Sequence, residues 1–578
     1  MRLFGKNFTV DKGSLSSSVL LTISFYLGFY VYNAVYLGKS TLSGAGAFLF
    51  ICAMLLISVF LVYCPLNYVF IKIDTLIDQA QSMTVERGIF KEVIKKNFLP
   101  FFFIIMLSWI PIMIVRYPGN IDPDTFWQLL QTRGLALASD HHPWFDTLLF
   151  SAFWSIGDLL GSHAWSLLFY CSLQMVCTSG ALALCLCYMK WLGVPRVIRG
   201  ASLLFVTVLP MIPMYAQVMA KDSLFAWLWL LFLLLYIEVL RSEGAFLNNR
   251  KMSVVFFAIC LLLTVTKKTG IYLILLSVIP LILVCPCARI RIGLSFGCSV
   301  LAFMLWTNVV LPAFGVVKGS SAEMMSIPSQ QVAYYLQMHS EEMTSRDWTV
   351  LEGVYASPEV LSTVYQPARA DATKGLWKNE SSLNQKLDFF AWYIRKSVRH
   401  PKTFILGALA TMLPLYYPDD STEGDESLLF YRDNLASRET GDAGLLQAIQ
   451  RYSDGLANDE DMNSLFSGCF RNPFIAKLSD LYDSLLHKIA SIFPPLFYKV
   501  TYTFYLPFIM AFYCFSRFAT YRSKRYPITV IVGFTPMFWM YLSLLAGPIA
   551  LPRYMGPAIY AVPLVLALPF VLLQCHRR

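Results

Sequence analysis

Charged residues are scarce in this chain of 578 residues. Asp, Glu, Lys and Arg make up only 14% of the sequence, whereas soluble globular domains contain about 25%. Hydrophobic residues reach 57%, and the mean hydropathy is +0.56. This composition excludes an ordinary soluble domain. It predicts an all-α protein that crosses a membrane many times.

Cysteine pairs that would indicate a disulfide framework or a metal site are absent. None of the 13 Cys residues forms a CxxC pair, and Cys285 and Cys287 form a CPC that is typical of the end of a span. Most of the others lie inside apolar runs, where we expect them to pack against neighbouring helices. These are Cys171, Cys177, Cys185, Cys187, Cys260 and Cys298.

Apolar stretches long enough to cross a bilayer, about 20 residues each, recur along the chain. We predict about twelve spans, at 17–37, 45–69, 98–115, 164–188, 200–217, 223–240, 253–267, 270–287, 292–312, 497–516, 527–546 and 555–574. The polar, basic N-terminal segment and the lack of a small-residue cleavage site after the first run favour a membrane anchor over a cleaved signal peptide.

Basic residues cluster after every second predicted span, which sets the orientation. Lys and Arg collect in cytoplasmic loops, so both termini are predicted to be cytoplasmic in a multi-pass protein of the cell membrane. This bias explains the net charge of +10 without a nucleic-acid partner. The clusters are Arg2, Lys6 and Lys12; Lys91, Lys95 and Lys96; Lys190, Arg196 and Arg199; Arg241, Arg250 and Lys251; Arg289 and Arg291; Arg517, Arg522, Lys524 and Arg525; and Arg577 and Arg578.

The spans divide the chain into three predicted parts. Residues 1–312 form a transmembrane module with a large first outer loop at 116–163, residues 313–496 an extracytoplasmic, mostly helical domain, and residues 497–578 the last transmembrane helices. Segment 143–160 is predicted to be an amphipathic helix in the outer interface, because a span there would reverse the charge bias downstream.

Two shorter segments of the predicted outer domain are assigned by length and charge. Residues 401–417 are apolar but short, so a buried or interfacial helix is favoured over a span. The acidic run 419–426 is predicted to be a solvated loop, with a divalent-ion site as the less favoured alternative.

The first outer loop carries unusual polar residues for such an apolar chain. The stretch RYPGNIDPDTFWQLLQTRGLALASDHHPW, residues 116–144, contains Asp122, Asp124, His141 and His142. Ionisable groups close to a membrane are costly and are usually functional. The predicted topology brings further polar residues to the same face: Lys221, Asp222, Lys267, Lys268, Gln330, Gln331 and Arg553.

These residue types suit a phosphorylated substrate at a membrane surface, because cations bind phosphate and a carboxylate accepts a proton from a hydroxyl. Structural alternatives stay open. Asp122 or Asp124 is also suited to cap a helix, with Pro123 at the first helical position. The His pair suits hydrogen bonding to the substrate and the end of a loop about equally, whereas adjacent residues in a loop are weak evidence for a metal ligand pair. Each cation is also compatible with a lipid-headgroup contact.

The ordered motifs resemble the GT-C superfamily of integral-membrane glycosyltransferases, and within it an uncharacterised multi-spanning family of Gram-positive bacteria. The matching residues are Tyr117, Pro118, Gly119, Asp124, Gln128, His141, His142, Pro143, the KD at 221–222, KKTG at 267–270, IPSQQ at 327–331, LGALATMLPLYYP ending at Pro418, and PRYMGP at 552–557. The resemblance implies an Asp of the first outer loop as base or acceptor-orienting group, which is Asp124 here, with Asp122 as competitor.

The resemblance also implies a polyprenyl-phosphate sugar as donor, with Lys268 and Arg553 at its phosphate and the His pair lining a substrate pocket. A divalent metal is used by some relatives and not by others, so that question stays open. An aqueous nucleotide sugar is disfavoured, since no glycine-rich Rossmann-type unit occurs. The expected acceptor is a cell-envelope glycan or a lipid-linked molecule, and membrane lipids surround the protein.

Two other classes of function remain as alternatives. A flippase or transporter of lipid-linked sugars would be expected to show charges at mid-membrane depth and repeated halves, whereas these polar groups lie at span ends and no internal repeat occurs. A structural or binding membrane protein would use its outer domain instead.

Overall fold

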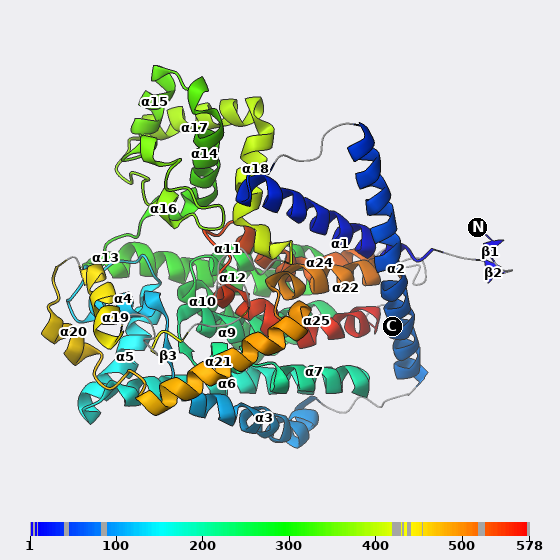
Figure 1. Ribbon diagram of the computed structural model, residues 1–578. Helices are drawn as coiled ribbons and strands as arrows, with labels where there is room; N and C mark the ends of the chain where they lie inside the picture. Colours follow the sequence, from blue (N-terminus) through cyan, green and yellow to red (C-terminus); the bar gives the residue numbers. More distant parts are fainter. Residues whose placement is uncertain are drawn as a thin grey trace.

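The computed structural model describes most of the chain (Figure 1). The described residues are 2–3, 6–7, 10–39, 45–82, 90–418, 429, 433–435, 441–453, 455–517 and 526–574. The acidic run 419–426 and the basic residues Arg522, Lys524, Arg525, Arg577 and Arg578 lie outside them. Helices dominate the described residues, which confirms the predicted all-α class.

Two short strand pairs interrupt the helical architecture. Strands β1 (Arg2–Leu3) and β2 (Lys6–Asn7) pair antiparallel near the start of the chain. Strands β3 (Asn120–Ile121) and β4 (Val218–Met219) pair in parallel, although the whole of 122–217 lies between them in the sequence. This second pair brings two distant loops together.

Eight described helices are long and apolar enough to cross a membrane. They are Lys12–Tyr36, Leu49–Gln79, Phe90–Val115, His163–Trp191, Lys221–Arg241, Pro286–Ala313, Tyr526–Leu545 and Pro552–Leu572. They comprise α1 (Lys12–Val31) with its π-helical end η1 (Tyr32–Tyr36), most of α2 (Ala45–Ser82), α3 (Phe90–Val115), α6 (His163–Trp191), α9 (Lys221–Arg241), α12 (Arg289–Leu305) with its flanking turns, α24 (Tyr526–Leu545), and η13 (Pro552–Met555) with most of α25 (Gly556–Gln574).

The other four predicted spans are helical but shorter. Stretch 200–217 is divided into α7 (Arg196–Val208) and α8 (Met211–Ala216), because Pro210 cannot continue the helical hydrogen bonding. The remaining three correspond to α10 (Arg250–Thr266), α11 (Gly270–Val284), and η12 (Thr501–Tyr505) with α22 (Leu506–Ser516). A polytopic membrane protein is therefore supported, and the number twelve stays a prediction.

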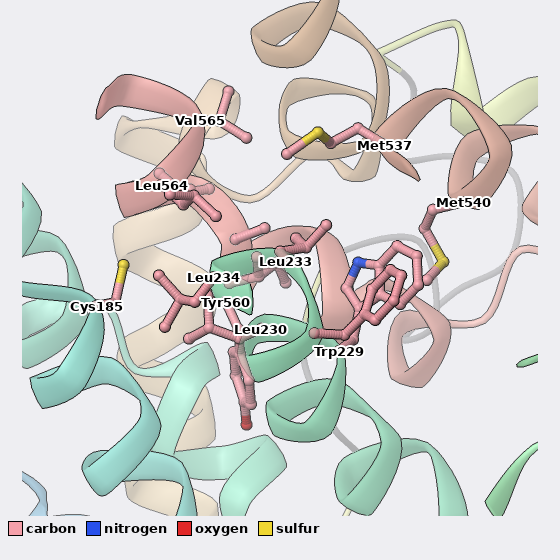
Figure 2. Close-up of a cluster of buried hydrophobic side chains, with 14 of the residues drawn as sticks. Cys185, Trp229, Leu230, Leu233, Leu234, Met537, Met540, Tyr560, Leu564 and Val565 are labelled. Carbon is pink, nitrogen blue, oxygen red and sulfur yellow. The ribbon is translucent and has the colours of Figure 1, made fainter. Parts of the chain in front are cut away.

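The helical bundle has a continuous apolar core. Figure 2 shows side chains of α6, α9, α24 and α25 meeting in it, among them Trp229, Met537 and Tyr560. Other large apolar side chains face outward instead: Leu56, Phe60 and Leu61 of α2 are each more than 60% exposed. A core buried between helices together with bare apolar outer faces is the arrangement of a protein whose surroundings are lipid.

Residues 321–415 form a separate helical unit above the bundle in Figure 1, which we name the cap unit. It contains η5 (Ser321–Met325), α14 (Ser326–His339), η6 (Ser340–Glu342), α15 (Ser345–Glu352), η7 (Pro358–Val360), α16 (Asp371–Lys374), α17 (Leu383–Arg399), α18 (Pro401–Thr411) and η8 (Leu413–Leu415). Its own apolar core includes Leu336, Leu351, Phe389 and Trp392. The predicted apolar segment 401–417 begins with α18, which packs on α14.

The predicted outer domain at 313–496 is divided in the structure. The cap unit takes its first part, whereas α19 (Gly441–Gln450) and α20 (Asp459–Leu465) share a core with α4 (Pro123–Thr132) and α5 (Trp144–Leu160). Helix α21 (Pro473–Ile492) crosses the bundle and packs on α3 (Figure 1). The reason is the amphipathic character of these later helices, whose apolar faces find partners on the first outer loop and the bundle.

Short turns complete the chain: η2 (Ala245–Asn248), η3 (Pro286–Ala288), η4 (Trp306–Val310), α13 (Leu311–Ala313), η10 (Arg451–Ser453) and η11 (Pro494–Leu496). The predicted helix at 143–160 is present as α5, which packs between α4 and α6. Its interfacial position stays a prediction. Strands β1 and β2 lie on the side of the bundle away from α4 and α5 (Figure 1).

Candidate functional site

The parallel pair β3–β4 positions the first outer loop against the loop before α9. Asp122 N–H donates to Met219 O over 3.3 Å, and Thr125 Oγ1 donates to the same carbonyl over 2.7 Å. Both strands are followed at once by a helix, α4 and α9. The Asp residues after β3 and Lys221 after β4 are thereby brought to neighbouring helix starts.

The YPG segment before β3 is held by a buried ion-pair network. Arg471 donates to Gly119 O and pairs with Asp433, and Arg116 also pairs with Asp433 at 2.8 Å. Burial alone would raise the pKa of Asp433, but the two guanidinium groups lower it well below its usual value. Gly119 has φ +142°, and a Cβ there would lie 2.6 Å from Cys171 Sγ, so the close packing requires glycine.

Asp122 and Asp124 have different positions at the start of α4. Asp122 is the N-cap: its Oδ1 accepts from Asp124 N–H over 3.0 Å, and Pro123 occupies the first helical position. Its side chain is only 3% exposed and is ion-paired with Arg553. The capping alternative for Asp122 is thus confirmed, while Asp124, at 24% exposure, lies on the open side.

Two cations flank the Asp124 carboxylate. Its Oδ2 lies 2.6 Å from Lys221 Nζ and 3.2 Å from Arg553 Nη2. Burial would raise the pKa of Asp124, but Lys221 and Arg553 outweigh burial and lower it well below the usual value. Asp124 is therefore ionised throughout the neutral range.

A second layer of carboxylates holds the remaining cations. Asp222 Oδ1 lies 2.5 Å from Lys267 Nζ, and Arg553 Nε is 3.7 Å from Asp222 Oδ2. Lys268 donates to the backbone oxygen of Asp140 and lies 3.2 Å from its carboxylate. Burial raises the pKa of Asp140, with Lys268 opposing the shift. Each cation is thus oriented by a carboxylate from another loop.

The His pair joins this network through His142. Its Nδ1 is 2.7 Å from Lys221 Nζ, and because an ammonium group only donates, Nδ1 accepts and the ring proton is on Nε2. Burial, with help from the Lys221 charge, lowers the pKa of His142 well below its usual value. Burial also lowers the pKa of His141. Both rings are neutral at pH 7 and pack against Trp127.

These side chains line a cavity of about 480 Å³. The lining residues that carry charge or hydrogen-bonding groups are Asp124, Trp127, His141, His142, Lys221, Lys267, Lys268, Thr269, Glu323, Asp371, Lys374, Tyr452, Arg553 and Tyr554. Five of them are cations and three are carboxylates, so the lining favours a negatively charged ligand.

The cap unit closes one side of this cavity. Lys374 lies 2.8 Å from the carboxylates of both Glu323 and Asp371. Val317 N–H, just before the cap unit, donates to Ala138 O next to the His pair, and Ala370 N–H donates to Pro548 O in the loop before Arg553. The cap unit therefore fixes two loops of the cavity wall.

Gln330 and Gln331 lie elsewhere, which corrects their predicted substrate contact. Gln330 is buried inside the cap unit, where its side chain donates to Gln366 O and accepts from Thr373 Oγ1. Gln331 donates to Phe404 O over 2.8 Å. Both amides satisfy backbone or side-chain groups of the cap unit, and neither lines the cavity.

Several site residues could not be expected from the sequence. Glu323, Asp371, Lys374 and Tyr452 belong to segments far from the first outer loop, and no motif marked them. Asp146 of α5 is fully buried behind the site, its two carboxyl oxygens have no hydrogen-bond partner among the described residues, and burial raises its pKa well above the usual value. Because Asp146 lies apart from Asp122 and Asp124 in the sequence, no motif marked it as a site residue.

The divalent metal left open by the sequence has no obvious ligand set in the cavity. Among the residues that the structure describes, the cavity holds no three His, Cys, Asp or Glu side chains with ligand atoms within 4.8 Å of one another. Its carboxylates face Lys and Arg side chains instead.

Residues 130–422 match a family described as a family of unknown function, DUF6020. The matched range contains the His pair, Lys221, Lys268 and the cap unit, whereas Asp122 and Asp124 precede it and Arg553 follows it. No curated protein and no solved structure matches the chain.

Proposed function

We propose that this chain, which belongs to the DUF6020 family of unknown function, transfers a sugar from a polyprenyl-phosphate donor to an acceptor hydroxyl outside the cytoplasm. The enzyme would be a GT-C-type glycosyltransferase of the cell membrane, with about twelve spans and both termini in the cytoplasm. Its acceptor would be a glycan or a lipid-linked molecule of the bacterial cell envelope.

The observation that carries this proposal is the grouping of one accessible carboxylate with several cations at span ends. Asp124 lies beside Lys221 and Arg553 in the cavity wall. The cations begin or precede apolar helices such as Lys221–Arg241 and Pro552–Leu572. A lipid phosphate in the membrane can therefore reach them while its sugar enters the cavity.

The proposed reaction is a displacement at the anomeric carbon. The acceptor hydroxyl attacks that carbon, the bond from the carbon to the phosphate oxygen breaks, and polyprenyl phosphate leaves as an anion. Asp124 takes the proton of the hydroxyl as general base. The leaving phosphate needs no proton, because cations of the cavity stabilise its negative charge.

The ionised state of Asp124 fits this role once a donor is bound. In the protein alone, Lys221 and Arg553 hold its pKa low, and such a carboxylate is a weak base. A donor phosphate that attracts the same two cations reduces their effect on Asp124. The pKa of Asp124 then rises toward the range in which it accepts a proton, so donor binding activates the base.

The neutral His142 has a supporting role in this scheme. Its Nδ1 is held by Lys221, so its Nε2–H is directed by that contact. An N–H group of a neutral ring binds sugar hydroxyls without competing for the phosphate. We therefore assign His142, with His141 beside it, to binding the sugar or the acceptor.

A flippase of lipid-linked sugars remains the second candidate, supported by the same cation-lined cavity. A flippase, unlike a glycosyltransferase, needs a route by which the lipid-linked sugar passes through the helical bundle. The apolar packing between α6, α9, α24 and α25 (Figure 2) offers a charged sugar phosphate no polar route there. Glycosyl transfer in the cavity is therefore favoured.

The test is sugar transfer by the purified protein in vesicles that contain a labelled polyprenyl-phosphate sugar and acceptor lipids. Asp124→Asn and Asp124→Ala should lower the transfer rate by roughly 10²–10⁴-fold, the usual range for a general base. Asp158→Asn is the matched control, since Asp158 is 40% exposed, forms an ion pair with Arg133 and lies 3.5 Å from His163, outside the cavity. Its rate should equal that of wild type.

Equal transfer by wild type and both Asp124 variants would refute the base assignment. Movement of labelled lipid across the bilayer without transfer would replace the enzyme by the flippase.

A further inference from the structure

Three residues of metal-binding types, two His and one Glu, converge at one end of the cap unit. His339 ends α14, Glu342 ends η6, and His400 lies between α17 and α18. His339 Nδ1 is 2.9 Å from Glu342 Oε1, and His400 Nε2 is 3.1 Å from Glu342 Oε2. All three ligand atoms lie within 4.8 Å of one another. Three separate segments thus present nitrogen and oxygen atoms to one point.

The other nitrogen of His339 is also held. Its Nε2 lies 3.0 Å from Thr403 Oγ1. Metal-binding histidines commonly donate their second N–H to an oxygen, which fixes the ring orientation and the tautomer. When Nε2–H donates to Thr403, a neutral ring presents the Nδ1 lone pair to the Glu342 carboxylate, and a cation between them makes this arrangement favourable; in the other tautomer Nδ1–H donates to Glu342 directly.

His400 gives the same indication independently. Its Nε2 is shielded from solvent and makes no hydrogen bond of acceptable geometry within the described residues, although a carboxylate oxygen is 3.1 Å away. A ring nitrogen that is close to a carboxylate but poorly aligned with it fits two ligands around a shared ion better than a direct hydrogen bond.

The spacing matches a small divalent ion with nitrogen and oxygen ligands. Zinc binds His nitrogen and carboxylate oxygen at about 2.0–2.2 Å in tetrahedral geometry, which separates neighbouring ligand atoms by roughly 3.3 Å. His339 lies 2.9 Å from one oxygen of Glu342 and His400 lies 3.1 Å from the other, and both separations are within a few tenths of an ångström of this value.

We propose that His339, Glu342 and His400 bind one Zn²⁺ ion, with a fourth position open to water. Glu342 is 40% exposed, so solvent reaches the ion. The ion joins the end of α14 to the corner between α17 and α18, and these helices lie together in Figure 1. It stabilises the packing of α14 on α18.

This site is distinct from the cavity of the proposed reaction. Glu323, which lines the cavity, precedes the start of α14, whereas His339 is its last residue. A helix of 14 residues is about 20 Å long at 1.5 Å per residue. The zinc proposal therefore does not depend on sugar transfer.

The experiment is zinc titration of the full-length protein, purified in detergent without a polyhistidine tag and stripped with a chelator. Competition with a chromophoric zinc chelator should show one tight site per wild-type chain, and zinc should raise the thermal unfolding midpoint. His400→Gln and His339→Asn should abolish both effects. Thr403→Val, which removes only the supporting oxygen, should weaken binding by roughly 10–100-fold.

The double variant His141→Asn/His142→Asn is the matched control for zinc in the cavity. It should bind zinc like wild type. X-ray absorption of the wild-type complex should show imidazole nitrogens and a carboxylate oxygen around the ion, which tests the site even if a variant fails to fold. The proposal is overturned if the wild type binds no zinc, or if His400→Gln binds zinc as tightly as the wild type. Loss of zinc binding in the cavity variant, or an absorption spectrum without imidazole ligands, would also overturn it.

Discussion

Asp146 is a buried carboxyl group without a hydrogen-bond partner in the described residues, and its folded-state pKa is raised by burial. The linkage between protonation and folding gives the sign of its effect on the free energy of unfolding. Below its unfolded pKa near 3.8, Asp146 is neutral in both states and makes no pH-dependent contribution to stability. As the pH rises through the interval up to the folded pKa, the unfolded state ionises first, so stability falls by about 1.4 kcal/mol per pH unit.

Asp146→Asn keeps the shape of this side chain and cannot ionise. We expect the variant to unfold at a higher temperature than wild type at pH 7, and the difference should shrink as the pH approaches 4. Thermal unfolding of the detergent-solubilised protein at several pH values measures this. A difference that grows toward acidic pH would contradict the raised pKa.

Arg553, whose side chain is 13% exposed, faces three carboxylates, those of Asp122, Asp124 and Asp222, of which Asp122 and Asp222 are buried. Removal of one partner from a buried ion pair usually costs about 3–5 kcal/mol, because a charge is left without compensation. Arg553→Ala should therefore lower the free energy of unfolding by that amount, measured by denaturant titration. Arg133→Ala is the control, since its pair with Asp158 is partly exposed and should contribute about 1 kcal/mol or less.

The sequence grouped most of the residues of the cavity in one hypothesis, but it could not show which role each of them has. DPD offers two Asp residues with the same neighbours, and only the folded structure shows that Asp122 is the buried N-cap whereas Asp124 lines the cavity. Gln330 and Gln331 were misplaced for a related reason. Their motif is polar and near a predicted span, but the partners that satisfy both amides, Gln366 O and Phe404 O, lie 36 and 73 residues further along the chain.

At the scale of elements, the helices were predictable wherever apolar residues recur over a long stretch. Helix α5 is one example, and the charge bias downstream of it distinguished it from the spans. The division of 313–496 was not predictable. The choice between a separate domain and packing on α4 depends on the shape of the first outer loop, which local sequence does not encode.

The YPG segment is the element most sensitive to a small change. A Cβ on Gly119 would contact Cys171 Sγ at 2.6 Å, and its φ of +142° disfavours any side chain. Gly119→Ala should cost about 1–3 kcal/mol from backbone strain and about 1–3 kcal/mol more from overpacking. Thermal or denaturant unfolding measures the loss.

Gly134→Ala separates these two contributions. Gly134 also has a positive φ, +69°, but no other atom would lie within 4 Å of a Cβ added at this position. Only the strain contribution is therefore expected there. Equal losses for Gly119→Ala and Gly134→Ala would show that contact with Cys171 does not matter.

At the scale of the whole molecule, the orientation in the membrane decides whether the cavity faces outward. The proposed topology predicts that Glu380→Cys, in the exposed surface of the cap unit, reacts with a membrane-impermeant thiol reagent in intact cells. Arg196→Cys, at the exposed start of α7, should react only after lysis. Cells that express the protein without an introduced cysteine give the background. Labelling of Arg196→Cys in intact cells would reverse the proposed orientation.

The ion pair between Arg553 and Asp122 joins residues 431 positions apart. A ribosome therefore delivers Asp122 to the membrane long before its guanidinium partner has been translated. Until the last spans insert, Asp122 at the N-cap of α4 lacks its ion-pair partner Arg553. The loop before α25, which forms part of the cavity wall, is also missing. Assembly of the cavity is thus a late event in biosynthesis, and a chain terminated ahead of residue 553 presents an incomplete pocket to the proteases that survey membrane proteins.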